Sequence, residues 1–133
     1  MKLDCVKEIR EKILALEDKL SDLRDVQGSI ATTHIDGLPK AKKLDSSVER
    51  IVARIAETQD LIDSLQVELA GVMIDLSDEI SRRVKSSRAR KILHRRYVCC
   101  DMFKEIAVDL RLSQNEVFYY HRKACKEFNS AAA

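Results

Sequence analysis

The sequence predicts an all-α protein in which a long antiparallel coiled-coil hairpin is followed by a C-terminal helix-turn-helix domain. Three observations lead to this fold class. The 133 residues include only three glycines and one proline, so residues that break helices are scarce. Apolar residues recur at alternating intervals of three and four over two long stretches, as they do along one face of a helix. This pattern stops near Ser86, beyond which shorter helices are predicted.

The first predicted helix covers about residues 2–27. Gly28 is expected to end it, because glycine adopts the left-handed conformation of a helix C-cap without steric strain. Residues 28–44 hold two of the three glycines and the only proline, and we predict a linker there that is either functional or disordered. The apolar stripe of the first helix consists of Val6, Ile9, Ile13, Leu16, Leu20 and Leu23.

The second predicted helix runs from Ser47 to about Arg83. Ser46 and Glu49 have the spacing of a capping box, which marks a helix start. Its apolar stripe continues without interruption through Val48, Ile51, Ile55, Thr58, Ile62, Leu65, Leu69, Val72 and Leu76.

Both stripes must be buried, because neither helix is stable alone with its apolar side in water. The first helix is therefore expected to fold back on the second. Because the second helix is longer by about a dozen residues, part of its stripe is expected to stay uncovered, which favours a homodimer through the heptad helices. The alternative is a monomer in which the spare stripe packs on the C-terminal domain. We accordingly assign residues 1–84 to an oligomerisation region and 85–129 to a second domain.

Charge is distributed unevenly along the chain. Residues 1–81 hold 11 Lys and Arg against 17 Asp and Glu, whereas residues 82–133 hold 13 against 5. A basic end on an acidic body indicates either that residues 82–126 face a polyanion or that they form a solvated helical surface.

Several classes of site and location are excluded by the residues present. The four cysteines form no CxxC pair and have no zinc-like spacing to histidine, so no metal is expected. His34, His94 and His121 lie far apart, and no phosphate-binding glycine loop occurs, so neither an enzyme nor a cofactor is expected. No apolar run reaches the roughly 18 residues of a membrane span, and the charged N-terminus is unlike a signal peptide, so the cytoplasm is the expected location.

Residues 103–122 match the requirements of a helix-turn-helix. Ala107 supplies the small residue that two close helices need, and Leu112 with Ser113 supplies an apolar plug followed by a helix cap. Ser113 and Glu116 again have capping-box spacing. The alternative is a pair of helices that merely pack together. The expected inward residues are Ile106, Ala107, Leu110, Val117 and Tyr120.

The outward side of the helix over residues 113–127 is then expected to enter the major groove of double-stranded DNA. Gln114 and Asn115 can recognise adenine edges, and Arg122 can reach a guanine or a phosphate. Phe118 and Tyr119 are expected to lie against thymine methyls or sugars, unless they are buried against the preceding helix. The full set of expected DNA-binding residues is Ser113, Gln114, Asn115, Phe118, Tyr119, Arg122, Lys123, Lys126, Lys104, Arg88 and Arg95.

Residues 88–128 resemble region 4 of sigma-70-type transcription factors. The shared features are Ile92-Leu93, Arg96-Tyr97, Glu105-Ile106-Ala107, Leu110, Leu112-Ser113, Val117 and Lys123-Ala124. Two heptad helices followed by such a module are similar to small regulators of bacteriophages and prophages, including late-gene activators of the RinA and ArpU type.

This resemblance implies a regulator of phage or prophage transcription in the cytoplasm of a bacterial host, with RNA polymerase as a possible second partner. The sequence departs from the family at three positions, one of which is Tyr120, where the family often has arginine. Arg111 stands at the turn glycine and must accept its geometry. Met102 stands where Ser or Thr often caps the first helix, so Asp101 is expected to take over that cap. A small-terminase-like subunit of DNA packaging and a helical module that binds only proteins are the alternative functions.

Overall fold

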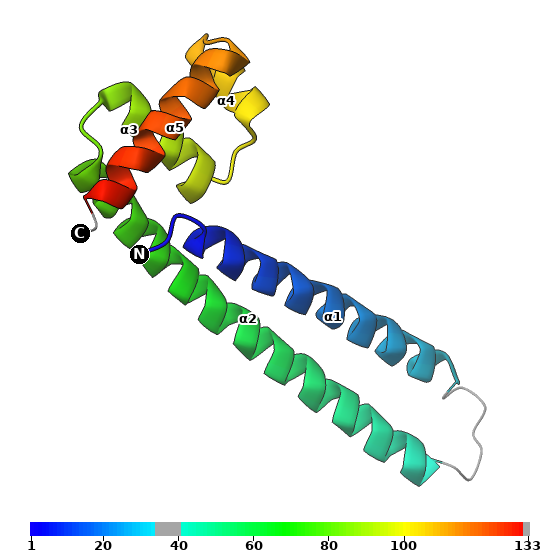
Figure 1. The fold of residues 1–133 in the computed structure, drawn as a ribbon. Helices are drawn as coiled ribbons and strands as arrows, with labels where there is room; N and C mark the ends of the chain where they lie inside the picture. The colour runs from blue at the N-terminus through cyan, green and yellow to red at the C-terminus, as the bar shows by residue number, and fades with distance from the viewer. Residues whose placement is uncertain (34–40, 132–133) are drawn as a thin grey trace. The chain divides into compact units, whose positions relative to one another are not determined.

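A computed structural model describes residues 1–33 and 41–131 of the chain, with the side chains of 31–33 and 41–45 left aside. Every regular element in these residues is helical, which confirms the all-α class (Figure 1). In the described helices, no stretch combines the length and the apolar character needed to cross a membrane. The elements are α1 (Cys5–Thr33), α2 (Ala41–Arg83), α3 (Ser87–Leu93), a π-helical turn η2 (His94–Val98), α4 (Phe103–Leu110) and α5 (Gln114–Ser130).

Two predicted helix ends are wrong. Gly28 lies inside α1, which continues to Thr33, because glycine permits a C-cap but does not impose one and costs a helix interior only about 1 kcal/mol. The capping-box residue Ser46 lies inside α2, because the preceding residues from Ala41 onward are mostly strong helix formers. The predicted linker 28–44 is therefore helical at both ends, and its residues 34–40 lie outside the described residues.

Residues 10–68 form one compact unit, here called the helical-pair unit. Its parts of α1 and α2 run side by side in opposite directions (Figure 1). The buried residues fall on the predicted heptad positions, and one of them is polar. That residue, Thr58, donates its hydroxyl to the Arg54 carbonyl at 2.7 Å, so its burial leaves no polar atom without a partner. The buried residues are Ile13, Leu20, Thr58 and Ile62.

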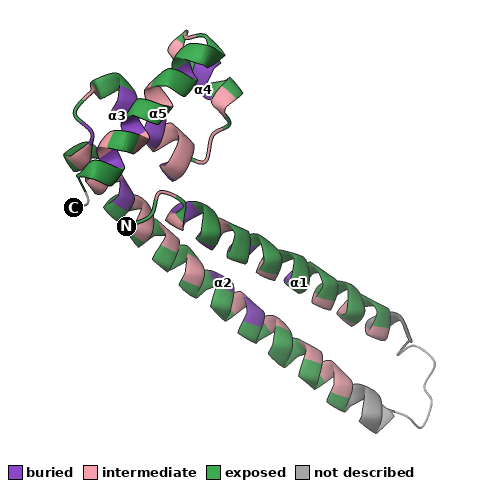
Figure 2. Cartoon of the chain, in the orientation of Figure 1, coloured by how far each residue is buried: buried purple, intermediate pink, exposed green. Residues whose placement is uncertain are grey.

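Met1–Ile9 and Leu69–Ala133 form the other compact unit, here called the C-terminal unit. Its larger core joins the first turn of α1, the end of α2 and the inner face of α5. Buried residues occur in each of these helices and in α3 (Figure 2). The cluster consists of Val6, Leu76, Ile80, Val84, Ala89, Leu93, Val98, Ala124 and Phe128.

This core changes the expected burial of the second apolar stripe. Leu69 and Val72 pack against the same cluster, in which Leu76 is fully buried. The C-terminal end of the stripe is thus buried or partly buried within the C-terminal unit, as the monomeric alternative expects. The units also do not coincide with the expected division between residues 84 and 85, because Ile80 and Val84 share a core with Phe128.

A second, smaller core lies between α3, α4 and α5. Ile92, Ile106, Ala107 and Val117 are buried there, and four partly buried residues surround them. Those four are Phe103, Leu110, Leu112 and Tyr120. The residues predicted to face inward therefore do so, and the two cores fix α5 on one side along most of its length.

Replacing Val6 with alanine is expected to destabilise the C-terminal unit, although Val6 is distant from it in sequence. Val6 is fully buried in that core, and the lost methyl groups and residual cavity correspond to about 2 kcal/mol. All three tyrosines lie between residues 97 and 120, so urea unfolding followed by tyrosine fluorescence reports on this unit. Leu14→Ala, at a position 60% exposed on the same helix, is the control. An unchanged tyrosine transition in Val6→Ala would contradict the assigned core.

Candidate nucleic-acid interface

Three residues connect α4 to α5, and each has a defined conformation or contact. Arg111 adopts the left-handed conformation, with φ 55° and ψ 44°. This is the conformation predicted for it, because Arg111 stands at the position of the turn glycine. Its backbone thereby reverses direction at the end of α4. The Leu112 amide donates to the Ala107 carbonyl at 2.9 Å, and the Leu112 side chain packs on the smaller core. The connection is therefore tightly determined.

Ser113 caps the start of α5. Its hydroxyl accepts a hydrogen bond from the Glu116 amide at 3.1 Å and donates to the Glu116 carboxylate at 3.1 Å. This confirms the predicted pairing of Ser113 with Glu116. The predicted cap of α4 by Asp101 is wrong, because Met102 occupies the cap position without a side-chain bond and the Asp101 carboxylate binds Arg95 instead.

The two faces of α5 differ sharply in character. Its buried side contains Val117, Ala124 and Phe128. Spacings of three and four residues place the exposed side chains of Asn115, Tyr119, Arg122 and Lys126 on the opposite side. Gln114 and Ser113 are exposed at the capped end, and Lys123 is exposed at the margin. Polar, basic and aromatic groups thus share one solvent-facing strip of a single well-anchored helix.

Phe118 lies at the margin of this strip, next to Tyr119 in sequence, and neither ring is buried in the fold. Phe118 is 40% exposed and Tyr119 is 55% exposed. The inner side of Phe118 packs on Phe103 at the start of α4, with ring centroids 5.2 Å apart and planes at 63°. The Arg96 guanidinium lies over the Phe103 ring, 4.4 Å from its centroid. Tyr119 similarly contacts Tyr120, at 5.3 Å.

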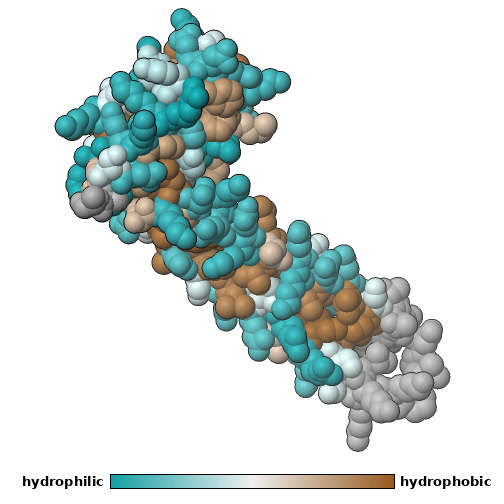
Figure 3. Space-filling view, viewed as in Figure 1, coloured by the Kyte–Doolittle hydropathy of each residue, from teal (hydrophilic) through white to brown (hydrophobic). Residues whose placement is uncertain are grey.

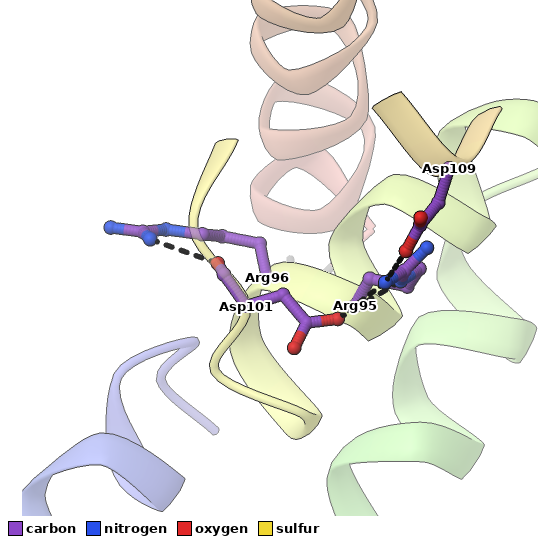
Figure 4. Close-up of polar contacts among 4 residues, drawn as sticks. All are labelled: Arg95, Arg96, Asp101 and Asp109. Atoms are coloured by element: carbon purple, nitrogen blue, oxygen red, sulfur yellow. Dashed lines mark hydrogen bonds and ion pairs between the residues drawn. The ribbon is translucent and has the colours of Figure 1, made fainter. Parts of the chain in front are cut away.

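Arg95 is placed differently from the other predicted DNA-binding residues. Its guanidinium forms ion pairs with the carboxylates of Asp101 and Asp109 (Figure 4). The hydrogen bonds to Asp109 and Asp101 raise the pKa of Arg95 above its ordinary value, and Asp109 contributes most. Pairing with two carboxylates leaves this guanidinium less available to phosphate, and it ties η2 to α4 and to the loop between them. Binding of DNA by Arg95 stays a prediction.

Other basic side chains also form two groups, those bound to an acidic side chain or a carbonyl and those exposed to solvent. Arg96 donates to the Asp101 carbonyl at 3.0 Å (Figure 4). Arg82 and Arg83 both pair with Glu79. Arg88 is exposed and lies beside Tyr120, with its guanidinium 5.5 Å from the ring centroid. Lys104, Lys123 and Lys126 are exposed. Exposed cations are thus present on α4 and α5, and Arg88 adjoins α5 from α3; Lys85 and Lys91, before and on α3, are exposed as well.

Behind the strip, His121 joins a half-buried group of polar side chains. Its Nε2 lies 2.7 Å from the Tyr97 hydroxyl and 3.5 Å from the Cys125 Sγ. Burial lowers the pKa of His121, and the nearby Arg96 lowers it further. Burial also raises the pKa of Tyr97 to about 12 and raises the pKa of Cys125. All three groups are therefore held in their neutral forms at neutral pH.

Sequence reasoning missed the structural role of Phe103 and the acidic partners of Arg95. Phe103 is the first residue of the predicted helix-turn-helix, and it contacts Phe118, 15 residues later in the sequence and beyond the turn. The available signal was an aromatic residue at the start of α4, which alone does not identify its partner. The sequence did not indicate that Asp101 and Asp109 would pair with Arg95. Arg95 lies in a π-helical turn, and the spacing of a regular α-helix does not predict the direction of its side chain.

Comparison with known proteins gives no independent indication of what this site binds. No family model matches the chain, and no curated protein or solved structure is significantly similar to it. What the strip on α5 binds is therefore inferred from its residues, their exposure and their charge.

The stability of the C-terminal unit is expected to fall as the pH drops below about 6.5, partly through His121. Its folded pKa is lowered, so below the ordinary value of 6.5 the unfolded chain binds more protons than the folded one. Above that value this contribution vanishes. Urea midpoints from tyrosine fluorescence at about pH 7.5 and about pH 5.5 measure the effect. His121→Gln cannot titrate there, so its decline should be smaller; an equal decline would contradict the contribution of His121.

Proposed function

We propose that this chain is a DNA-binding transcription regulator of phage or prophage genes. In this proposal α4, the turn at residues 111–113 and α5 act as a helix-turn-helix. The helix over residues 113–127 enters the major groove and presents its exposed strip to the base edges. The resemblance of residues 88–128 to sigma region 4 supports the choice of a transcription regulator, and RNA polymerase is the further partner that it suggests.

The observation that carries the proposal is the exposed strip on a helix whose other face is anchored by two cores. Base recognition requires side chains held in a fixed register, which such an anchored helix supplies. Gln114 and Asn115 stand at its capped start, where amide side chains can form paired hydrogen bonds with adenine. Arg122 lies two turns further along and can reach a guanine edge or a phosphate.

Affinity would come from the exposed cations around the strip. Lys104, Lys123, Lys126 and Arg88 can each neutralise a phosphate, which releases bound counterions and makes binding dependent on salt. The net charge of residues 82–133 has the sign that this requires. Arg95 is less available for such a contact because Asp101 and Asp109 already hold it.

Self-association as a homodimer through the heptad helices is part of the proposal. The uncovered stripe no longer supports it, since that segment is buried or partly buried within the C-terminal unit. The support is now the apolar surface that remains on the helical-pair unit, where Leu14, Val52, Leu61 and Val67 are exposed. Figure 3 shows brown, apolar surface interrupted by teal, hydrophilic surface along the α1–α2 pair.

Arg122→Ala and Gln114→Ala are each expected to weaken binding to a selected DNA duplex about 5- to 100-fold, because each removes a base contact or a phosphate contact. Lys126→Ala should instead reduce the slope of log affinity against log salt by about 1, with similar effects on all duplexes. Gel retardation or fluorescence anisotropy over a salt series measures both effects. The control is Arg24→Ala, which removes an exposed charge from α1. A folded protein that binds no duplex at low salt would refute the proposal.

The mass of the protein in solution is expected to be about twice the 15.2 kDa of one chain, as measured by light scattering after size exclusion. Val67→Glu, which places a charge at a position 76% exposed, should shift the population toward the monomer. Lys12→Glu, at an exposed polar position, is the control. A ring of about eight to twelve chains would instead favour the packaging alternative, and a monomer at all concentrations would exclude the dimer.

A further inference from the structure

Phe118, which the sequence predicts to lie against thymine methyls or sugars, has features that none of the hydrogen-bonding or charged residues proposed to contact DNA shares. It is an apolar ring, 40% exposed, in a strip whose other members are polar, basic or phenolic. An exposed phenyl ring on this strip gains stability only when an apolar group covers its free side. The neighbours one turn away, Gln114 and Arg122, are both suited to hydrogen bonding and do not provide that cover.

The inner side of the Phe118 ring is packed against other side chains. Phe103 contacts it at 5.2 Å, His121 contacts Phe103 at 4.9 Å, and the Arg96 guanidinium lies 4.4 Å from the centroid of the Phe103 ring. Arg96 is in turn bound to the Asp101 carbonyl. These contacts restrict the motion of Phe118, so little side-chain entropy remains to be lost when its outer side is covered.

The chemistry of the major groove limits what can cover that ring. The edges of the base pairs present hydrogen-bond donors and acceptors, and the one distinctive apolar group is the 5-methyl of thymine. We propose that Phe118 recognises the 5-methyl group of a thymine, which makes this residue a determinant of sequence specificity. The inference rests on the proposed DNA binding. It places the thymine beside the base pair contacted by Gln114 or Asn115, since those residues lie one turn before Phe118.

Phe103 is then a positioning residue, which touches no base and acts by holding Phe118. Its contribution to recognition is separable from its contribution to stability. A loosened Phe118 would still allow the basic residues to bind phosphates, so overall affinity and its salt dependence would change little. Discrimination between duplexes with and without the methyl group would fall.

The test begins with duplexes selected from a random library by the full-length protein. Each thymine of the selected site is replaced in turn by uracil, which removes the methyl group and preserves base pairing. One position is expected to lose about fourfold in affinity, the effect of exposing one buried methyl group. Phe118→Ala should bind the thymine and uracil duplexes equally at that position. Phe103→Leu should reduce the ratio with an unchanged salt slope, and the control Arg24→Ala, at an exposed position on α1, should keep it.

The outcomes separate this inference from the function on which it rests. Absence of duplex binding at low salt by the folded protein would remove both. Duplex binding with no penalty for uracil at any position would overturn the role of Phe118 and leave the proposed function in place. A uracil penalty that persists in Phe118→Ala would assign methyl recognition to another side chain. If Phe118→Ala lost binding to RNA polymerase but recognised DNA as before, the ring would belong to a protein interface and the inference would be overturned.

Discussion

The C-terminal unit depends on the packing of Phe128 in its larger core. This ring is 1% exposed, and it lies in one cluster with Val6 from α1 and with Ile80 and Val84 from α2. Arg83 covers the ring with its guanidinium, 4.6 Å from the centroid. Phe128 thereby fixes the last turns of α5, as Val117 fixes the first. A helix secured at both ends can expose its remaining face without losing its position.

The fold class and the inner faces of the helices followed from sequence because they depend on local periodicity. Apolar spacing identified the buried side of α1 and α2, and residue type identified Ala107 and Val117 as inward. The helix ends at Gly28 and Ser46 were mispredicted because a residue that can cap a helix does not by itself end one. For Ser46, good helix formers also precede it from Ala41 onward. The full extent of α1 and α2 could not be predicted from caps alone.

The basic residues show a different limit of sequence reasoning. A count of charges predicted a polyanion-facing surface but could not separate free cations from paired ones. Arg95 and Lys104 are equivalent by composition, yet the first is held by two carboxylates and the second is exposed. That difference arises from η2, whose wider turn directs Arg95 toward Asp101 and Asp109. Periodicity based on a regular helix does not anticipate it.

The sharing of one core by both ends of the chain also bears on the order in which the protein folds. Val6 and Phe128 are separated by about 120 residues of sequence, and closing so long a loop carries a large entropic cost. The helical-pair unit closes over a much shorter loop and can form while the chain is still being synthesised. The C-terminal unit must wait until its last helix has left the ribosome, and until then the first turn of α1 has no partner from α5.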